Sequence, residues 1–296
     1  MGDFPESCFT RATLPVECSD LYKLDSKEAR SLGEMLSHEF HAAEPFSHIV
    51  IDNFLPNSFI EEILRIFPSK TLSDDKYYED GYSGLHKRQV SPESCNHHVR
   101  SVFHFFNSAP FLQFLQGLTS IDSLIGDPYF NGGGFHEIFK GGKLGVHADF
   151  RINEQLHLAR RLNVLIYLNK DWHSEYGGDL EIWSRDMKYQ CKSISPEFNR
   201  CVIFCTDTDS YHGHPEPLNT PHGVTRKSLA LYYYTASKRI YEDLPSDSTM
   251  YVARPADGAY IKREAAMLRM QNYLKDWLPP AVFRSVVSVR RYLKNR

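Results

Sequence analysis

Apolar and polar positions divide the chain into a helical first part and a strand-rich second part. Residues 26–45 have a helical pattern that stops at a proline. Alternating apolar residues predict a strand over 47–55. Residues 56–68 predict a helix that begins with a capping box formed by Ser58 and Glu61 and ends at the next proline.

Two segments precede the strand-rich part of the chain, one irregular and one helical in pattern. Residues 71–100 are polar, rich in tyrosine and histidine, and without a clear period, which is typical of a lid or a binding loop. Residues 109–126 carry apolar side chains on one face and predict an amphipathic helix. Short β-type runs with Gly, Asn and Asp between them then follow, over 134–142, 143–150, 160–169, 177–184, 199–207 and 226–236.

This succession of short strands indicates a sandwich or barrel rather than alternating β and α units. Beyond it, residues 263–278 predict a helix that ends before a pair of prolines. The last segment, 281–296, has an apolar stripe, several basic residues and no acidic ones. It fits a packing helix with a solvated basic face, and the alternative is a helix that contacts a membrane surface or a partner protein.

Composition narrows the class of protein. The chain has 296 residues, of which 42% are hydrophobic and 13% aromatic, and this is ample for a packed core. A net charge of −3 gives no general attraction to nucleic acid, so no nucleic-acid partner is expected. The six cysteines include no CxxC pair, and no stretch is long enough to span a membrane, so we expect a reduced, cytoplasmic setting. Cys201 and Cys205 fit core positions of a strand better than a metal pair.

The sequence GVHADF places His147 and Asp149 one residue apart within a predicted strand. Side chains two positions apart on a strand project to the same side, so these two can reach one metal ion. An isolated H-x-D is weak support for a metal site, because the chain has 14 histidines. The interpretation depends on a third ligand.

His212, which follows the strand-rich segment, completes a set of two histidines and one carboxylate. Such a facial triad leaves coordination positions open and indicates non-haem Fe(II) that binds a co-substrate and O₂. Arg226 begins the next predicted strand, and its planar, permanently charged group suits the remote carboxylate of a diacid.

With these residues in place, the chain resembles the Fe(II)/2-oxoglutarate-dependent oxygenase superfamily, and in particular its prolyl 4-hydroxylase-like branch. The resemblance rests on the segments SHIVIDNFLPNSFIEEIL, YLNKDW followed by GGDLEIW, and SPEFNRCVIFCTDTDSYH. The resemblance implies an α+β fold, a double-stranded β-helix or jelly roll with flanking helices. We therefore expect an N-terminal extension over 1–45, the oxygenase domain over 46–240, and a C-terminal helical extension over 241–296.

The resemblance also implies roles. His147, Asp149 and His212 match the iron ligands, and Arg226 matches the residue that binds the 5-carboxylate of 2-oxoglutarate, with Tyr167 holding the same carboxylate. The implied cofactors are Fe(II), 2-oxoglutarate as co-substrate, O₂ and ascorbate. The implied reaction converts 2-oxoglutarate to succinate and CO₂ and hydroxylates an unactivated C–H bond, with a prolyl residue as one candidate target.

Details of the site remain open in the sequence. Phe139 stands near the position where the hypoxia-factor enzymes carry a co-substrate-ordering tyrosine, although the loop differs in length. Asp149 favours hydroxylation over halogenation, because halogenases of the family replace this carboxylate with a small residue. Strand alternation cannot separate His212 from His214 as the distal ligand, and the register of the resemblance decides for His212. His214, His222, His157 and His173 are expected to be exposed, and at least one of Tyr232, Tyr233 and Tyr234 must face the core.

Two other functions stay open at this point, namely a metal-dependent isomerase of the cupin type and a non-catalytic binding protein on the same barrel. Arg226 discriminates, because a cupin isomerase has no need of a fixed partner for the remote carboxylate of 2-oxoglutarate. The substrate, peptidyl or small-molecule, is not encoded in any motif. Besides a peptidyl proline, a free amino acid, a sugar or a lipid remains open.

Overall fold

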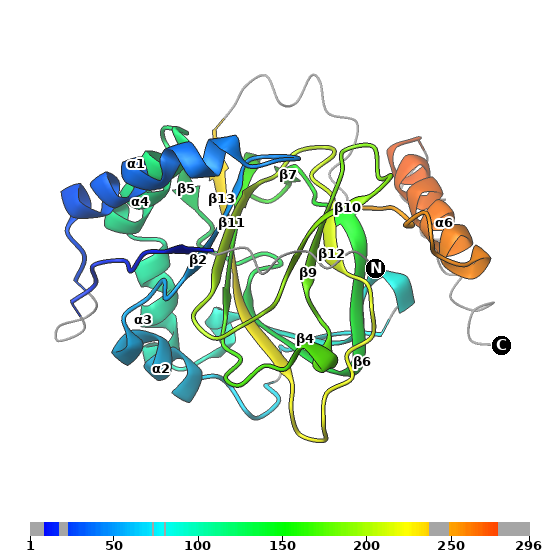
Figure 1. Cartoon of the computed structure of the whole chain (residues 1–296), viewed down its shortest axis with the longest axis horizontal. Helices are drawn as coiled ribbons and strands as arrows, with labels where there is room; N and C mark the ends of the chain where they lie inside the picture. Colours follow the sequence, from blue (N-terminus) through cyan, green and yellow to red (C-terminus); the bar gives the residue numbers. More distant parts are fainter. Residues whose placement is uncertain (1–8, 18–22, 73, 80, 237–248, 278–296) are drawn as a thin grey trace.

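A curled β-sheet with four helices against its outer face forms most of the protein (Figure 1). The structure is a computed structural model that describes residues 9–17, 23–72, 74–79, 81–236 and 249–277. The helices are α1 (Ser26–Ala42), α2 (Asn57–Arg65), α3 (His97–Phe106), α4 (Ala109–Thr119) and α6 (Ala259–Trp277). The strands are β1 (Thr10–Arg11), β2 (His48–Asp52), β3 (Lys76–Tyr78), β4 (Leu85–Val90), β5 (Ile125–Gly126), β6 (Gly134–Ala148), β7 (Ile152–Asn153), β8 (Leu158–Tyr167), β9 (Leu180–Trp183), β10 (Gln190–Ile194), β11 (Cys201–Cys205), β12 (His212–His214), β13 (Arg226–Thr235) and β14 (Met250–Tyr251).

The long strand β6 joins two opposed sheets. Its first half pairs with β13 and β4, and its second half pairs with β12 and β14. Gly141, with a φ of 78°, lies between the halves, and glycine adopts this conformation at no steric cost. Hydrogen bonding continues through β1-β2-β11-β8-β13-β6 into β12-β9-β10. The two predicted strands 134–142 and 143–150 are therefore one bent strand.

Successive strands alternate between the two sheets. After β6, the chain places β8 in the first sheet, β9 and β10 in the second, β11 in the first, β12 in the second and β13 in the first. This winding is a double-stranded β-helix, and the α+β jelly-roll fold expected from the sequence is confirmed. The interior of the roll lies between the sheets, and the functional residues face it.

Alternation along β8 supplies both faces of the first sheet. Leu162, Val164 and Ile166 are fully buried toward the helices, whereas Tyr167 belongs to a second apolar cluster between the sheets. The helix side is rich in phenylalanine, and its members include Phe40, Phe54, Phe59, Phe103, Phe106, Phe111 and Phe114. This layer stabilises the first sheet chiefly through buried apolar area.

Helix α1 packs closely on α4 because two glycines meet at their crossing. A Cβ on Gly33 would lie 2.2 Å from the carbonyl oxygen of Phe114, and one on Gly117 would lie 2.4 Å from that of Arg30. In addition, β1 pairs with β2 in parallel. Described parts of the expected N-terminal extension therefore pack against the rest of the protein, while its proposed boundary at residue 45 remains a prediction.

Two helical predictions need correction at their ends, and one helix was not predicted. Helix α2 has Pro56 as its N-cap without a side-chain cap bond, so the predicted capping box of Ser58 and Glu61 does not form. Helix α4 ends at Thr119 rather than near residue 126, because Ser120 adopts a left-handed conformation with a φ of 55°. Helix α3, which begins at the polar end of the segment 71–100 and continues beyond it, was not predicted from the sequence.

The segment 71–100 is more ordered than its composition suggests. It forms the β3–β4 hairpin, and β4 extends the first sheet by pairing with β6. The buried guanidinium of Arg88 fixes β4 through ion pairs with Asp75 at 2.7 Å and Glu137 at 3.0 Å. The hairpin therefore forms one wall of the roll. Tyr78 and Lys87 of this hairpin line the interior cavity, which agrees with the predicted binding segment.

Residues 249–252 also pack against the roll. Strand β14 pairs with the end of β6, opposite His147 and Ala148, and the hydroxyl of Tyr82 donates to the carbonyl of Val252 at 2.9 Å. Helix α6 confirms the helix predicted over 263–278. The basic segment 281–296 lies outside the described residues. Within the described parts of the chain, no helix combines the length and apolarity needed to cross a membrane.

Candidate active site

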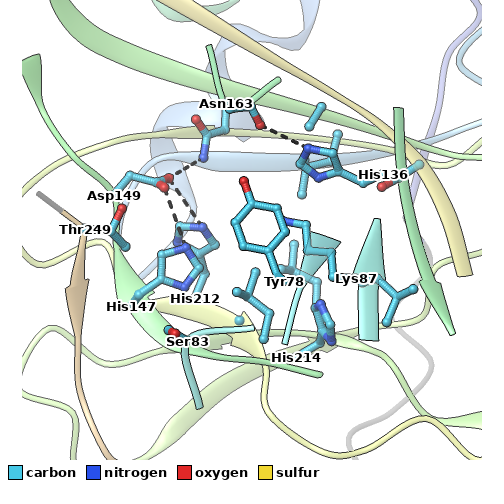
Figure 2. Close-up of a pocket in the computed structure, with 18 of the residues that line it drawn as sticks. Tyr78, Ser83, Lys87, His136, His147, Asp149, Asn163, His212, His214 and Thr249 are labelled. Carbon is cyan, nitrogen blue, oxygen red and sulfur yellow. Dashed lines mark hydrogen bonds and ion pairs between the residues drawn. The ribbon is translucent and has the colours of Figure 1, made fainter. Parts of the chain in front are cut away.

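The two sheets bring His147, Asp149 and His212 together. His147 lies near the end of β6, Asp149 directly follows that strand, and His212 begins β12, where it pairs with His147. Their ligand atoms all lie within 4.8 Å of one another. Each histidine Nε2 faces the carboxylate, at 3.6 Å for His147 and 3.5 Å for His212 (Figure 2).

Backbone carbonyls orient both rings. The Nδ1 atom of His147 lies 2.8 Å from the carbonyl oxygen of Gly145, and that of His212 lies 2.9 Å from that of Ser210. Since a carbonyl only accepts, each Nδ1–H donates and each Nε2 presents its lone pair to the shared point. Burial, with a contribution from His147, lowers the pKa of His212 to about 4, so this ring is neutral near pH 7.

Two side chains from β8 hold the carboxylate of Asp149. The Asn163 amide donates to Oδ2 at 2.6 Å, and the Arg160 guanidinium lies 3.2 Å from the same oxygen. Burial opposes ionisation of Asp149, but the charge of Arg160 and the adjacent His147 outweigh it and lower its pKa well below the usual range. Two imidazole nitrogens and an ionised carboxylate are the donor set of a 2-His-1-carboxylate iron site, so these residues fit Fe(II).

Arg160 is a functional candidate that sequence reasoning missed. It is 1% exposed, and its guanidinium carbon lies 3.5 Å from the ring centroid of Tyr232 and 4.5 Å from that of Phe150. These aromatic faces and Asp149 stabilise the buried charge. Tyr232 thus faces the cavity, while Tyr233 packs in the core as expected of one of the three tyrosines.

Arg226 lies at the far end of the same cavity. Its Nε donates to the carbonyl of Gly178 at 2.8 Å, and its Nη2 lies 3.3 Å from the hydroxyl of Tyr167. No carboxylate pairs with Arg226 among the residues that the structure describes. A buried, oriented guanidinium without an anionic partner fits the distal carboxylate of a dicarboxylate ligand.

One cavity of about 240 Å³ contains these groups. Its walls come from both sheets, from the β3–β4 hairpin and from β14, which contribute His136, Ile138, Ser228, Tyr78, Lys87 and Tyr251 among others. Figure 2 shows the triad on one side and Lys87, Tyr78 and His214 on the other. The cavity is large enough for a small dicarboxylate together with part of a second molecule.

The structure separates His212 from His214. The ladder between β6 and β12 shifts register between them, so His212 pairs with His147 and His214 pairs with Leu144. His214 lines the cavity but lies outside the triad. The expectation that His214 is exposed is wrong, because it is only 4% exposed. His157, His173 and His222 are exposed as expected.

Phe139 does not lie where a side chain could order the co-substrate, as the tyrosine of the hypoxia-factor enzymes does. It is 36% exposed and lies outside the cavity lining, because alternation along β6 turns His136 and Ile138 inward. His136 is 8% exposed, and its Nε2 lies 3.0 Å from the carbonyl oxygen of Gly132. Burial, with the charge of Lys87, lowers the pKa of His136 well below its usual value, so its ring is neutral.

Comparison with known proteins agrees with this geometry. Residues 133–234 match the family described as the 2OG-Fe(II) oxygenase superfamily, and this range holds the triad and Arg226. Mouse (Mus musculus) prolyl 3-hydroxylase OGFOD1 is 26% identical over 219 residues, which are 71% of this chain and 37% of the mouse protein. The chain therefore corresponds to little more than a third of that relative.

Similar solved structures include two prolyl hydroxylases. A Trichoplax adhaerens prolyl hydroxylase, solved with a fragment of the hypoxia inducible factor oxygen degradation domain, has a TM-score of 0.49 and 16% identity, covering 74% of this chain and 96% of that one. A Pseudomonas putida prolyl-4-hydroxylase has a TM-score of 0.49 and 15% identity, covering 69% and 100%. Over residues 133–234 the chain is thus similar to the 2OG-Fe(II) oxygenase superfamily, and a prolyl 3-hydroxylase is among its relatives.

Proposed function

We propose that this protein is an Fe(II)- and 2-oxoglutarate-dependent dioxygenase that hydroxylates an unactivated C–H bond and releases succinate and CO₂. The observation that carries the proposal is the placement of His147, Asp149 and His212 in one cavity with Arg226. Arg226 argues against a cupin-type isomerase, because such an enzyme has no need of a fixed partner for the remote carboxylate of 2-oxoglutarate.

In this proposal each side chain of the site has a separate role. His147, Asp149 and His212 hold the iron, and Arg226 with the Tyr167 hydroxyl binds the 5-carboxylate of 2-oxoglutarate. Bound iron supplies the activation of O₂ that is coupled to decarboxylation of 2-oxoglutarate. The carbonyls of Gly145 and Ser210 keep the imidazoles in the required tautomer, and burial of the triad limits access of water.

For the substrate we propose only a chemical class. The names of the relatives favour a peptidyl proline, since OGFOD1 is a prolyl 3-hydroxylase and two solved relatives are prolyl hydroxylases. A free amino acid, a sugar, a lipid or another small molecule is the alternative. Ascorbate as a reductant and a cytoplasmic location remain predictions from the sequence. So does a membrane or protein contact through 281–296, which deletion of this segment would test.

Anaerobic titration tests the iron and co-substrate assignment. Fe(II) and 2-oxoglutarate added to the metal-free protein should produce the weak visible charge-transfer band of the chelate, and admission of O₂ should release succinate. Absence of this band in folded, metal-loaded protein would reject the proposal.

A pair of arginine variants locates the co-substrate. Arg226→Met should raise the KM for 2-oxoglutarate about ten- to a hundredfold, because a charge-assisted hydrogen bond contributes about 1.5–3 kcal/mol. Arg185→Met is the matched control, since Arg185 is an exposed arginine paired with Asp209 on the surface. An unchanged KM in Arg226→Met would place the distal carboxylate elsewhere.

A further inference from the structure

The cavity carries more positive charge than iron and 2-oxoglutarate can balance. Its charged lining residues are three cations, Lys87, Arg160 and Arg226, and one carboxylate, Asp149. On the proposed function, Fe(II) adds two positive charges and 2-oxoglutarate adds two negative ones. The loaded cavity then keeps two positive charges in excess. Because unbalanced charge is costly in a buried site, a further anion is expected there.

Lys87 is the cation left without a partner. Arg160 pairs with Asp149 at 3.2 Å, and Arg226 would take the distal carboxylate of the co-substrate. The Lys87 ammonium lies 5.1 Å from the ring centroid of Tyr78 and, within the described part of the chain, forms no hydrogen bond or ion pair with a protein group. Its three donors are therefore available to a ligand.

Strand register places Lys87 and Arg226 at two separate points. Lys87 on β4 pairs with Ile138 on β6, and Ile138 pairs with Arg226 on β13. With neighbouring strands about 4.8 Å apart, the two cations start about 10 Å from each other, on opposite sides of Ile138. One carboxylate bound by Arg226 thus leaves Lys87 free for a second anion.

His214 supplies a second, independent sign of a ligand. It is 4% exposed and lines the cavity, and its Nδ1 has no hydrogen-bond partner among the described groups. Figure 2 shows its ring on the same side of the cavity as Lys87 and Tyr78. A buried ring nitrogen without a partner is rare unless a ligand or water completes it.

The charge state of Lys87 supports this role. Burial lowers the pKa of Lys87 to about 8, with Asp149 acting in the opposite direction and Arg226 in the same one. The ammonium therefore remains mostly protonated at pH 7. An anion bound beside it would favour the charged form further.

We propose that the substrate to be hydroxylated carries a carboxylate and that Lys87 binds it, with His214 beside the same subsite. This inference rests on the proposed function and specifies its substrate class. The carboxylate could belong to an acidic residue of a peptide or to a free amino or imino acid, and the two sources share the same chemistry at Lys87.

Binding without turnover tests the proposal. The full-length protein is loaded with Zn(II) and 2-oxoglutarate and titrated by calorimetry with N-acetylated tripeptide amides that have proline at the centre and Glu, Gln or Lys on either side. N-acetylproline and its amide form the second arm. We expect the wild type to bind an acid at least ten times more tightly than its amide, and the arm that shows this difference identifies the source of the carboxylate.

Variants of Lys87 assign the preference to this residue. Lys87→Gln should reduce the acid-to-amide ratio below about threefold, and Lys87→Glu should favour the lysine peptide over the glutamate peptide. Lys140→Gln is the matched control, because Lys140 is an exposed lysine on the adjacent strand β6 and the change in net charge is identical. Circular dichroism of each variant confirms folding.

Three results would overturn the proposal. These are equal or absent binding of acid and amide by the wild type, an acid preference that survives in Lys87→Gln, and a tenfold weaker affinity for 2-oxoglutarate as the sole effect of Lys87→Gln. The proposed function is tested separately by succinate release from the Fe(II) form without added substrate. Acid preference without succinate release would reject the dioxygenase and keep the anion site.

Discussion

At the scale of residues, simple periodicity locates the triad but not the groups around it. His147 and Asp149 could be paired from the two-residue period of a strand, and Arg226 from its place at the start of another. Arg160 could not, because the ladder between β8 and β13 shifts register between Arg160 and Leu162. This bulge turns Arg160, not Arg161, toward the cavity, and no sequence pattern shows where a bulge occurs.

The choice of distal ligand can be tested with two histidine variants. His212→Ala should abolish binding of Fe(II), because one of three ligands is lost, whereas His214→Ala should retain the iron. The measurement is the iron content of protein reconstituted and desalted without oxygen. An iron-free His214→Ala protein beside an iron-containing His212→Ala protein would reverse the assignment.

Arg160 should stabilise the metal-free protein chiefly by balancing Asp149. In Arg160→Met the carboxylate is buried without a cation, and we expect a loss of about 3–5 kcal/mol in the free energy of unfolding. A divalent ion such as Mn(II) replaces the missing positive charge, so it should raise the stability of this variant more than that of the wild type. Urea unfolding with and without Mn(II) measures both effects.

The neighbouring arginine provides the control for this experiment. Arg161→Met alters the same strand, but Arg161 is only partly buried and contacts Thr235 rather than Asp149. Its response to Mn(II) should equal that of the wild type. An equal response of Arg160→Met would show that Arg160 acts through packing and not through charge.

At the scale of elements, long periodic segments were predicted well and short or context-dependent ones were not. The helix over 26–45 and the strands β8, β11 and β13 follow from their patterns. Strand β12 has three residues, and β4 carries polar side chains because Arg88 is paired on one face and Lys87 faces the cavity. Only the tertiary structure supplies these partners, so composition alone indicates a loop.

The crossing of α1 and α4 gives an element-scale prediction. Gly33→Ala should destabilise the protein by about 1–3 kcal/mol, although alanine favours helices, because its Cβ would lie 2.2 Å from the Phe114 carbonyl oxygen. Ser31→Ala, at an exposed position of the same helix, is the control and should be neutral or slightly stabilising. A stabilised Gly33→Ala protein would show that α1 is not held at this crossing.

At the scale of the whole molecule, the jelly roll places several neutral histidines in its interior. Burial is the first cause that lowers the pKa of His48, His136, His212 and His214. The strand pattern predicted a barrel or sandwich, but the inward orientation of His136, His212 and His214 depends on the bend in β6 and on the register shift between β6 and β12. Each ring remains neutral in the folded state and can take up a proton on unfolding.

His48, which lies away from the triad, makes a contribution to the pH dependence of the free energy of unfolding that can be measured. It is 1% exposed on β2, and burial lowers its pKa from 6.5 to about 4 despite the bond of its Nδ1 with the Phe46 carbonyl. Between these two values the unfolded chain binds a proton that the folded protein does not, so stability falls as the pH falls. The shift corresponds to about 3 kcal/mol lost between pH 6.5 and pH 4.

His48→Asn should remove this contribution, because its amide can donate to the same carbonyl but does not titrate in the range. The comparison concerns how stability changes with pH in each protein, and not the absolute stability at one pH. Urea unfolding of the metal-free protein from pH 7 to pH 4 should show a loss smaller by about 3 kcal/mol in His48→Asn than in the wild type. Parallel curves would mean that His48 is already protonated in the folded protein, with its charge solvated despite its burial on β2.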